Sequence, residues 1–328
     1  MRRTLLRALS RPAVVGSADR HEQADFCLLD LLERLRALDY RFVTPTPETH
    51  RRVLEREPGA TARDLRGIFG WSLPFERALP SAEIFDALGS AGMVREEAGL
   101  FRSLVRISSI GDRLFLHSSY PTNEIDSVFL GPDSYRFARF LKAEIPGGPP
   151  VGRLVDIGAG AGVGAVMAAA LVPDARLTLT DINPFALRLA RINARHAGLT
   201  VETLICPGLD GVAGPFDLAI ANPPFIVDPG KRAYRDGGAG QGSALSLAWA
   251  LAAARKVAAG GRVLLYTGSA IVAGEDRLEA ALRASLPNAG CTLRYFEIDP
   301  DIFGEELGRP GYEDVDRIAA VGAVIEKG

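Results

Sequence analysis

Hydrophobic side chains in the first hundred residues recur every three to four positions, the period of a helix with one buried face. This spacing predicts helices over residues 24–40, 61–71 and 81–91. The apolar side of the first helix is expected to comprise Phe26, Leu29, Leu32 and Leu35. The second helix is expected to begin at a capping box formed by Thr61 and Asp64.

Residues 101–107 and 113–118 have the composition of strands and flank a Gly-Asp pair, which predicts a hairpin. Three helices followed by a hairpin suggest a winged-helix-like module. We therefore expect a smaller helical domain over residues 1–126, with a role in substrate recognition, and a second domain over 127–328. A chain beginning near Ser127 is expected to fold alone.

The second region alternates short apolar runs with Ala-rich amphipathic stretches, which predicts an α/β domain with an open sheet. Strands are expected after residue 152 and over residues 176–180, 216–221, 262–267, 292–298 and 318–325. Helices are expected to end near residues 143 and 172 and to span 185–196 and 243–258.

An Asn-Pro-Pro-Phe motif, Asn222, Pro223, Pro224 and Phe225, directly follows the predicted strand 216–221. Proline fixes its own φ and favours extended backbone in the preceding residue, so this turn is stiff. The Asn222 side-chain oxygen and the Pro223 carbonyl can accept the two hydrogens of a planar NH2 group, on which Phe225 can stack. Amide and exocyclic base nitrogens are poor nucleophiles because the lone pair is delocalised, and two such acceptors hold the nitrogen toward a tetrahedral geometry. The alternative is an ordinary Asn-Pro turn after a buried strand.

A glycine-rich turn, with Gly158, Gly160 and Gly162, follows the first strand of this region. Glycines let the backbone approach a ligand, and the N-terminus of the next helix offers free N–H groups. Asp156 can orient the turn and an amine of the ligand, and Asp181 can accept both hydroxyls of a ribose. The glycine spacing also fits a nicotinamide cofactor. Asp156 and the Asn-Pro-Pro-Phe motif favour S-adenosylmethionine.

Together these segments resemble the class I S-adenosylmethionine-dependent methyltransferases. Within that class the chain is similar to the branch of the release-factor glutamine methyltransferases (HemK/PrmC type) and the small-domain ribosomal RNA methyltransferases. The resemblance covers roughly residues 131–328 and includes the glycine-rich segment 234–242. It implies a Rossmann-like, seven-stranded sheet and N-methylation of a protein glutamine or a nucleobase.

The resemblance also implies a set of site residues. The expected cofactor-binding residues are Asp156, Gly158, Gly160, Gly162, Asp181, Ile182 and Asn222. The expected catalytic residues are Asn222, Pro223 and Phe225. The expected substrate-binding residues are Asn222, Pro224, Phe225 and Tyr234.

Three features depart from the glutamine methyltransferase pattern. Phe225 stands where those enzymes usually carry Tyr, and Cys206-Pro-Gly stands where many relatives place an acid near the adenine. Asp210 is a possible substitute for that acid. The predicted hairpin also departs from the all-helical N-terminal domain of those enzymes, which weakens the transfer of their substrate.

Composition restricts the partners. The formal net charge is −2, and residues 21–120 balance 13 Lys and Arg against 15 Asp and Glu, so nucleic acid is possible but not favoured. Cys27, Cys206 and Cys291 are isolated, so neither a metal site nor a disulfide framework is expected. No apolar run reaches about 18 residues, and a cytoplasmic location without membrane contact is expected. The basic opening segment could pass for a transit peptide, although a plain first helix or a frayed terminus is favoured.

Several alternatives remain open at this point. The acceptor could instead be a small-molecule or peptide metabolite, and an inactive cofactor-binding scaffold is disfavoured because Asp156, Asp181 and Asn222 are intact. Residues 128–134 either line the cofactor pocket or form a plain linker. Residues 299–316 carry seven acids against Arg309, and a solvated surface loop is favoured over a grip on a cationic substrate.

Overall fold

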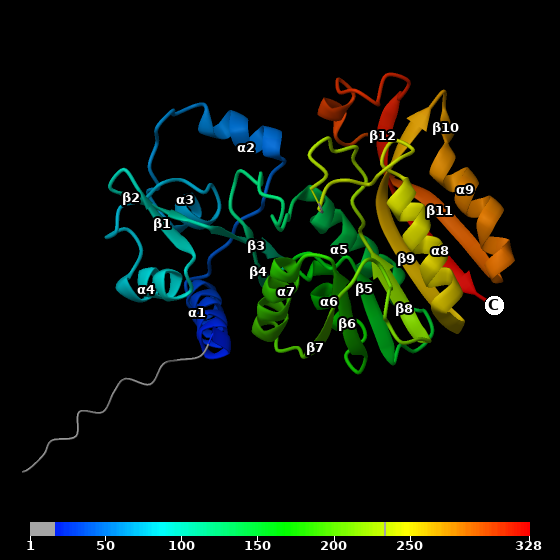
Figure 1. Cartoon of the computed structure of the whole chain (residues 1–328), viewed down its shortest axis with the longest axis horizontal. Helices are drawn as coiled ribbons and strands as arrows, with labels where there is room; N and C mark the ends of the chain where they lie inside the picture. Colours follow the sequence, from blue (N-terminus) through cyan, green and yellow to red (C-terminus); the bar gives the residue numbers. More distant parts are fainter. Residues whose placement is uncertain (1–16, 233) are drawn as a thin grey trace, which may run out of the picture.

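The computed structural model describes residues 17–232 and 234–328, with an N-terminal group of helices and hairpins beside an α/β region (Figure 1). The basic segment that opens the chain lies outside the described residues. The expectation of a helix or a frayed terminus there stays a prediction.

The N-terminal region contains four helices followed by two antiparallel hairpins. The helices are α1 (Ser17–Ala37), α2 (Pro47–Leu54), α3 (Leu65–Phe69) and α4 (Ala82–Ser90). The hairpins pair β1 (Val94–Glu97) with β2 (Leu100–Ser103), and β3 (Val105–Ile110) with β4 (Arg113–Ser118). The helix-then-hairpin order expected from the sequence is confirmed.

Two local predictions in this region are wrong, and one helix was not predicted. The buried side of α1 comprises Leu28, Leu31, Leu32 and Leu35, whereas Phe26 is 45% exposed. The buried face is therefore rotated by part of a helical turn from the predicted one. Asp64, and not Thr61, caps α3 by accepting the Gly67 N–H at 2.7 Å. Helix α2 was not predicted, although Pro47 starts it behind a Thr46 cap, an arrangement that favours helix initiation.

The segment predicted as one strand, 101–107, belongs to two hairpins. The β1–β2 turn has positive φ at both central residues, Ala98 (52°) and Gly99 (79°), which is the conformation of a tight two-residue hairpin turn. Leu104 separates β2 from β3, and across it the Ser103 hydroxyl donates to the Val105 carbonyl and accepts the Val105 N–H. An Ala at the first turn position hides this hairpin from sequence analysis, since Asn, Asp or Gly usually mark it.

The α/β region is built on one sheet of order β11-β12-β9-β8-β5-β6-β7, with β10 paired to the far end of β9. The strands are β5 (Arg153–Ile157), β6 (Arg176–Asp181), β7 (Val201–Ile205), β8 (Phe216–Ala221), β9 (Val257–Val272), β10 (Glu275–Asp276), β11 (Cys291–Asp299) and β12 (Arg317–Lys327). Pairs from β7 to β9 are parallel, and β12 is antiparallel to both β9 and β11. The predicted Rossmann-like sheet with an antiparallel edge is confirmed.

Helices and short 3-10 turns connect the strands. They are α5 (Pro132–Glu144), α6 (Val163–Ala169), α7 (Pro184–His196), α8 (Ala244–Lys256), α9 (Arg277–Ser285), η1 (Leu286–Ala289) and η2 (Gly304–Glu306). From β5 the chain proceeds outward through β6 and β7, and then returns to place β8 on the other side of β5. This reversal opens a crevice at the carboxyl ends of β5 and β8, where open α/β sheets bind ligands.

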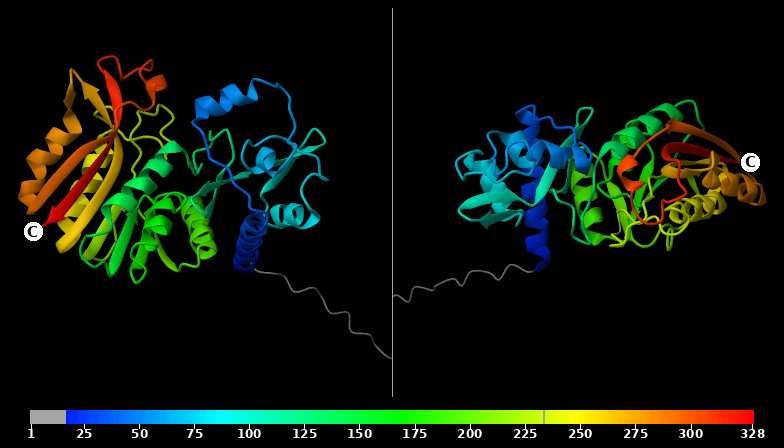
Figure 2. Two further views of the ribbon diagram at one scale, coloured as in Figure 1. Left: turned by 180° about the vertical axis from the view of Figure 1, so that it is seen from behind. Right: turned by 90° about the horizontal axis from the view of Figure 1, so that it is seen from above.

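The two regions share one hydrophobic core, and both views in Figure 2 show them side by side. Buried residues of α1, β3 and β4 pack in one cluster with residues of α6 and α7, such as Val166 and Leu189. The buried Asn193 amide of α7 accepts the Leu116 N–H at 2.8 Å and donates to the Leu116 carbonyl at 3.0 Å. A chain beginning at Ser127 would expose this core, which argues against the expectation that it folds alone.

Within the described ranges, no helix is long and apolar enough to cross a membrane. The same part of the chain contains no group of three or more His, Cys, Asp or Glu residues placed to hold a metal ion.

Candidate active site

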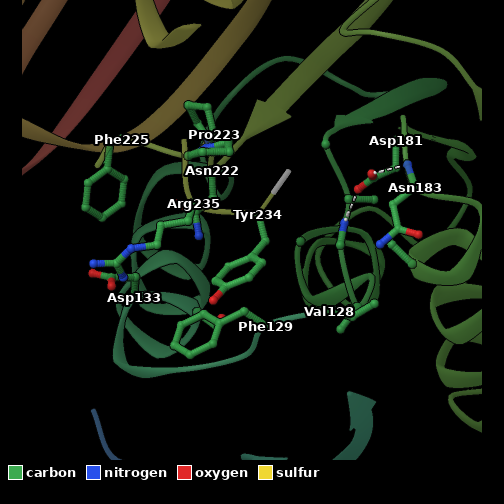
Figure 3. Close-up of a pocket in the computed structure, with 18 of the residues that line it drawn as sticks. Val128, Phe129, Asp133, Asp181, Asn183, Asn222, Pro223, Phe225, Tyr234 and Arg235 are labelled. Atoms are coloured by element: carbon green, nitrogen blue, oxygen red, sulfur yellow. Dashed lines mark hydrogen bonds between the residues drawn. The ribbon is translucent and has the colours of Figure 1, made fainter. Parts of the chain in front are cut away.

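A cavity of about 250 Å³ lies at the carboxyl ends of the central strands (Figure 3). Ten of the eleven predicted site residues line it: Asp156, Gly158, Gly160, Asp181, Ile182, Asn222, Pro223, Pro224, Phe225 and Tyr234. Gly162 does not line the cavity. It caps α6 at φ +77°, and a Cβ there would lie 3.0 Å from the Ala190 Cβ, so this glycine allows α6 and α7 to pack closely.

The glycine-rich turn keeps its backbone open to the cavity. Gly160 has φ +53°, and a Cβ built on it would meet no atom within 4 Å. At Gly164 a Cβ would lie 2.7 Å from the Asp156 carboxylate, so a side chain there would collide with that group. The glycines therefore serve two purposes, an open ligand-facing backbone and room for a buried acid.

Asp156, at the end of β5, is 1% exposed and accepts the Ala165 N–H at 2.8 Å. Burial raises the pKa of Asp156 to about 7, and the nearby Asp181 also raises it, whereas the Ala165 N–H lowers it. A buried carboxylate on a cavity wall is suited to a cationic group such as an amino-acid ammonium, whose charge would favour the ionised form.

Asp181, at the end of β6, holds the glycine-rich turn in place. Its two carboxylate oxygens accept the Gly160 and Asn183 N–H groups, each at 2.9 Å (Figure 3). Burial raises the pKa of Asp181, and these backbone N–H groups oppose that shift. Each carboxylate oxygen has a second lone pair, so Asp181 retains the capacity to accept ribose hydroxyls.

The Asn-Pro-Pro-Phe motif leaves β8 and enters the cavity wall (Figure 3). Among the described residues, neither the Asn222 side-chain amide nor the Pro223 carbonyl has a hydrogen-bond partner. The motif is held by backbone packing, because a Cβ at Gly242 would lie 2.2 Å from the Phe225 carbonyl oxygen. The ring of Phe225 packs over Gly268 and meets the Phe303 ring edge-on at 5.6 Å between centroids.

Tyr234 joins the cavity to the N-terminal region. Its ring stacks on Phe129 at 5.5 Å between centroids, and its hydroxyl donates to the Thr122 carbonyl at 2.9 Å. Phe129, Val128 and Asp133 also line the cavity, so the segment 128–134 is part of the site and not a plain linker. Because Phe129 covers one face of the Tyr234 ring, Tyr234 holds this wall together in addition to bordering the cavity.

The expectation of a solvated loop at residues 299–316 is wrong for its central part. Glu306 is 2% exposed and binds Arg235 at 2.5 Å and Arg309 at 3.3 Å. The buried Tyr312 hydroxyl accepts the Val227 N–H at 2.9 Å, and Phe303 lines the cavity. The loop is anchored because its apolar residues and one acid are buried against the segment that follows the Asn-Pro-Pro-Phe motif.

The cavity wall also contains residues that the sequence did not single out, among them Arg235, Trp249 and Phe303. Arg235 directly follows the predicted Tyr234, whereas Trp249 and Phe303 lie in separate segments that no local spacing links to the motifs. Cys206, Pro207 and Gly208 line the cavity, but Asp210 is exposed and does not. The structure therefore gives no support to Asp210 as the missing acid.

Comparison with known proteins agrees with this geometry. Residues 137–235 match the family model of the methyltransferase small domain. A release factor glutamine methyltransferase of Deinococcus radiodurans is 35% identical over 158 residues, covering 47% of this chain and 55% of that protein. Ribosomal RNA large subunit methyltransferase G of Vibrio vulnificus is 36% identical over 107 residues, covering 31% of this chain and 28% of that protein.

The chain thus spans about half the length of the first relative, and less of the second. A solved structure, the T. thermophilus 16S rRNA N2 G1207 methyltransferase in complex with AdoMet and guanosine, is 16% identical with a TM-score of 0.46. The match covers 73% of this chain and 60% of that one.

The match over residues 137–235 agrees with the methyltransferase class expected from the sequence, for which S-adenosylmethionine is the expected cofactor. The residues present fit this cofactor. Asp156 offers a buried carboxylate for its ammonium group, Asp181 offers acceptors for its ribose, and Gly160 leaves space for close approach.

Proposed function

We propose that this methyltransferase transfers the methyl group to a planar NH2 nitrogen, with a protein glutamine side chain as the preferred acceptor. One observation carries the proposal. The Asn222 side-chain oxygen and the Pro223 carbonyl lack partners among the described residues and border the same cavity as Asp156 and Asp181. One cavity thus carries two acceptors for an NH2 group and two acids that can hold the cofactor.

The reaction follows from these groups. When bound, the cofactor supplies an electrophilic methyl group on a sulfonium. Asn222 and Pro223 accept the two N–H hydrogens and so turn the nitrogen lone pair out of conjugation. Asn222 and Pro223 are fixed in place before the methyl-accepting substrate binds, so they stabilise the charge that develops on the nitrogen without reorganisation. The proton leaves after the N–C bond forms, when the nitrogen is positively charged and acidic.

The choice of a protein acceptor is supported by charge. Helix α4, which precedes the first hairpin, carries Glu83 and Asp86 and no Lys or Arg. The mixed charges of α2 are paired with one another, as in the Arg51 pairs with Glu48 and Glu55. Neither helix presents the unpaired positive charge that phosphate contacts require. The name of one relative, ribosomal RNA large subunit methyltransferase G, keeps a nucleobase as the second candidate.

The test is methyl transfer from labelled S-adenosylmethionine in a lysate of cells that lack this protein, followed by separation of protein, RNA and small molecules. We expect the label in the protein fraction and its release as methylamine on acid hydrolysis, because an N-methyl amide hydrolyses to that product. Label in an RNA base would shift the acceptor to a nucleobase. Label on oxygen, sulfur or carbon would contradict N-methylation.

The matched variant is Asn222→Ala. Loss of one acceptor that acts in the transition state should lower kcat by about 10²-fold or more while cofactor affinity stays near the parental value. Calorimetry with S-adenosylhomocysteine checks the affinity. Parental kcat in this variant would mean that another group activates the nitrogen.

A further inference from the structure

Trp249 of α8 occupies a wall of the cavity that no predicted motif supplies. Its six-membered ring lies against the glycine-rich turn, since a Cβ on Gly158 would sit 2.3 Å from it. Its indole nitrogen lies beside Gly208, where a Cβ would sit 3.1 Å from Nε1. Trp249 therefore bridges the turn after β5 and the segment after β7 on the cofactor side of the cavity.

The indole N–H of Trp249 has no hydrogen-bond partner among the described residues. The carbonyl of the adjacent Gly208 accepts the Thr180 hydroxyl at 2.7 Å. A tryptophan N–H is a donor only, so it can be satisfied only by an acceptor. An unpaired donor on a cavity wall is available to a ligand atom that accepts a hydrogen bond.

The segment beside Trp249, residues 206–208, contains no acid that could accept the amino hydrogens of an adenine. Cys206 is buried, burial raises its thiol pKa, and the exposed Asp210 lies outside the cavity lining. Ile182 lines the same cavity with a side chain that is 54% exposed, an apolar surface suited to the face of a base.

We propose that Trp249 recognises the adenine of the cofactor, with its indole N–H donating a hydrogen bond to a ring nitrogen of the base. Trp249 thus contacts an acceptor nitrogen of the adenine ring, whereas an acidic residue contacts the adenine amino group. This proposal rests on the assignment of S-adenosylmethionine as the cofactor.

The first test uses fluorescence, because the sequence contains only two tryptophans, Trp71 and Trp249. Trp71 packs against Phe42 and His50 in the N-terminal region and does not line the cavity. In Trp71→Phe, the emission of Trp249 should change saturably with S-adenosylhomocysteine. In the matched variant Trp249→Phe, the emission of Trp71 should not respond. A response from Trp71 with none from Trp249 would overturn the proposal.

The second test identifies the hydrogen bond by calorimetry. Trp249→Phe should weaken S-adenosylhomocysteine binding by roughly three- to tenfold, the worth of one neutral hydrogen bond. Three analogues of S-adenosylhomocysteine each lack one ring nitrogen of the adenine: 1-deaza, 3-deaza and 7-deaza. One of them should bind the parent protein more weakly by a similar factor, and its affinity should not fall further in Trp249→Phe. Independent losses for all three analogues would overturn the proposal. No binding of S-adenosylhomocysteine by the parent would instead overturn the methyltransferase assignment, and this proposal with it.

Discussion

The two halves of the cavity are held together in different ways. On the cofactor side, carboxylates bind backbone N–H groups nearby in the chain, as in the bond between Asp181 and Gly160, 21 residues apart. The acceptor side is the wall that faces the methyl-accepting substrate. There the segment after the Asn-Pro-Pro-Phe motif is held by contacts such as that between Arg235 and Glu306, 71 residues apart. The cofactor side is thus a local motif, whereas the acceptor side depends on the assembled fold.

This difference indicates how the two halves respond to change. A substitution on the cofactor side alters a charge or a hydrogen bond within a compact unit. A substitution on the acceptor side releases a loop that spans the cavity. The following predictions test that contrast, beginning with the largest effect.

Asp156→Asn should remove most of the pH dependence that this buried acid gives to stability. The folded-state pKa of about 7 lies above the unfolded value of about 3.9, so ionisation of Asp156 costs the folded state. The free energy of unfolding of the parent, relative to the variant, should therefore fall between about pH 4 and pH 7, by an amount on the order of 4 kcal/mol. Urea denaturation at a series of pH values measures it, and parallel pH profiles would contradict it.

The same titration should appear in cofactor binding. An ammonium favours the ionised carboxylate, so the affinity of the parent for S-adenosylhomocysteine should rise roughly tenfold between pH 6 and pH 8. Asp156→Asn should show weaker binding with a flatter profile. Calorimetry at both pH values gives the comparison.

Glu306→Gln should destabilise the acceptor side, because the buried Arg235 would lose its nearer carboxylate partner and retain only Asp228, at 3.6 Å. Breaking a buried ion pair in this way costs about 3 kcal/mol. A lower Tm and a loss of methyl transfer should accompany nearly parental cofactor affinity. Glu305→Gln is the control, since Glu305 is exposed in the same loop. Equal effects of the two substitutions would show that the buried pair does not hold the loop.

Asp181→Ala should lower the affinity for S-adenosylmethionine at least tenfold, because hydrogen bonds to a charged group contribute about 1.5–3 kcal/mol each. Calorimetry measures the loss, and circular dichroism checks that the fold survives. Asp210→Ala is the control, and its affinity should match that of the parent. An equal loss in Asp210→Ala would restore that residue as a cofactor contact.

Phe225→Tyr should have the smallest effect, with kcat/KM within about threefold of the parent, because the aromatic face survives. Phe225→Ala removes both the stacking face and the contact with Phe303, and should cost considerably more. Steady-state kinetics with the identified acceptor separates the two. If Phe225→Ala retained parental kcat/KM, the stacking role of Phe225 would be excluded.

Much of the cofactor side could be predicted because its chemistry lies in short motifs. Asp156 and Asp181 each end an apolar run, and parallel strands bring such ends to one edge of the sheet. Trp249 could not be predicted, because it reaches the cavity only through the packing of its own helix. The burial of Glu306 was missed for a related reason, since its partner Arg235 is remote in sequence.

The sequence by itself determined the alternation of strands and helices, the glycine-rich turn and the Asn-Pro-Pro-Phe motif, because these depend on hydrophobic period and backbone freedom over a few residues. Tertiary structure decided that the N-terminal helices share a core with α6 and α7, and that the acidic loop closes on the acceptor side. Those features depend on which surfaces meet. A buried Asn193 or Glu306 is recognisable only once its distant partner lies beside it, because an unpaired polar group cannot be buried without cost.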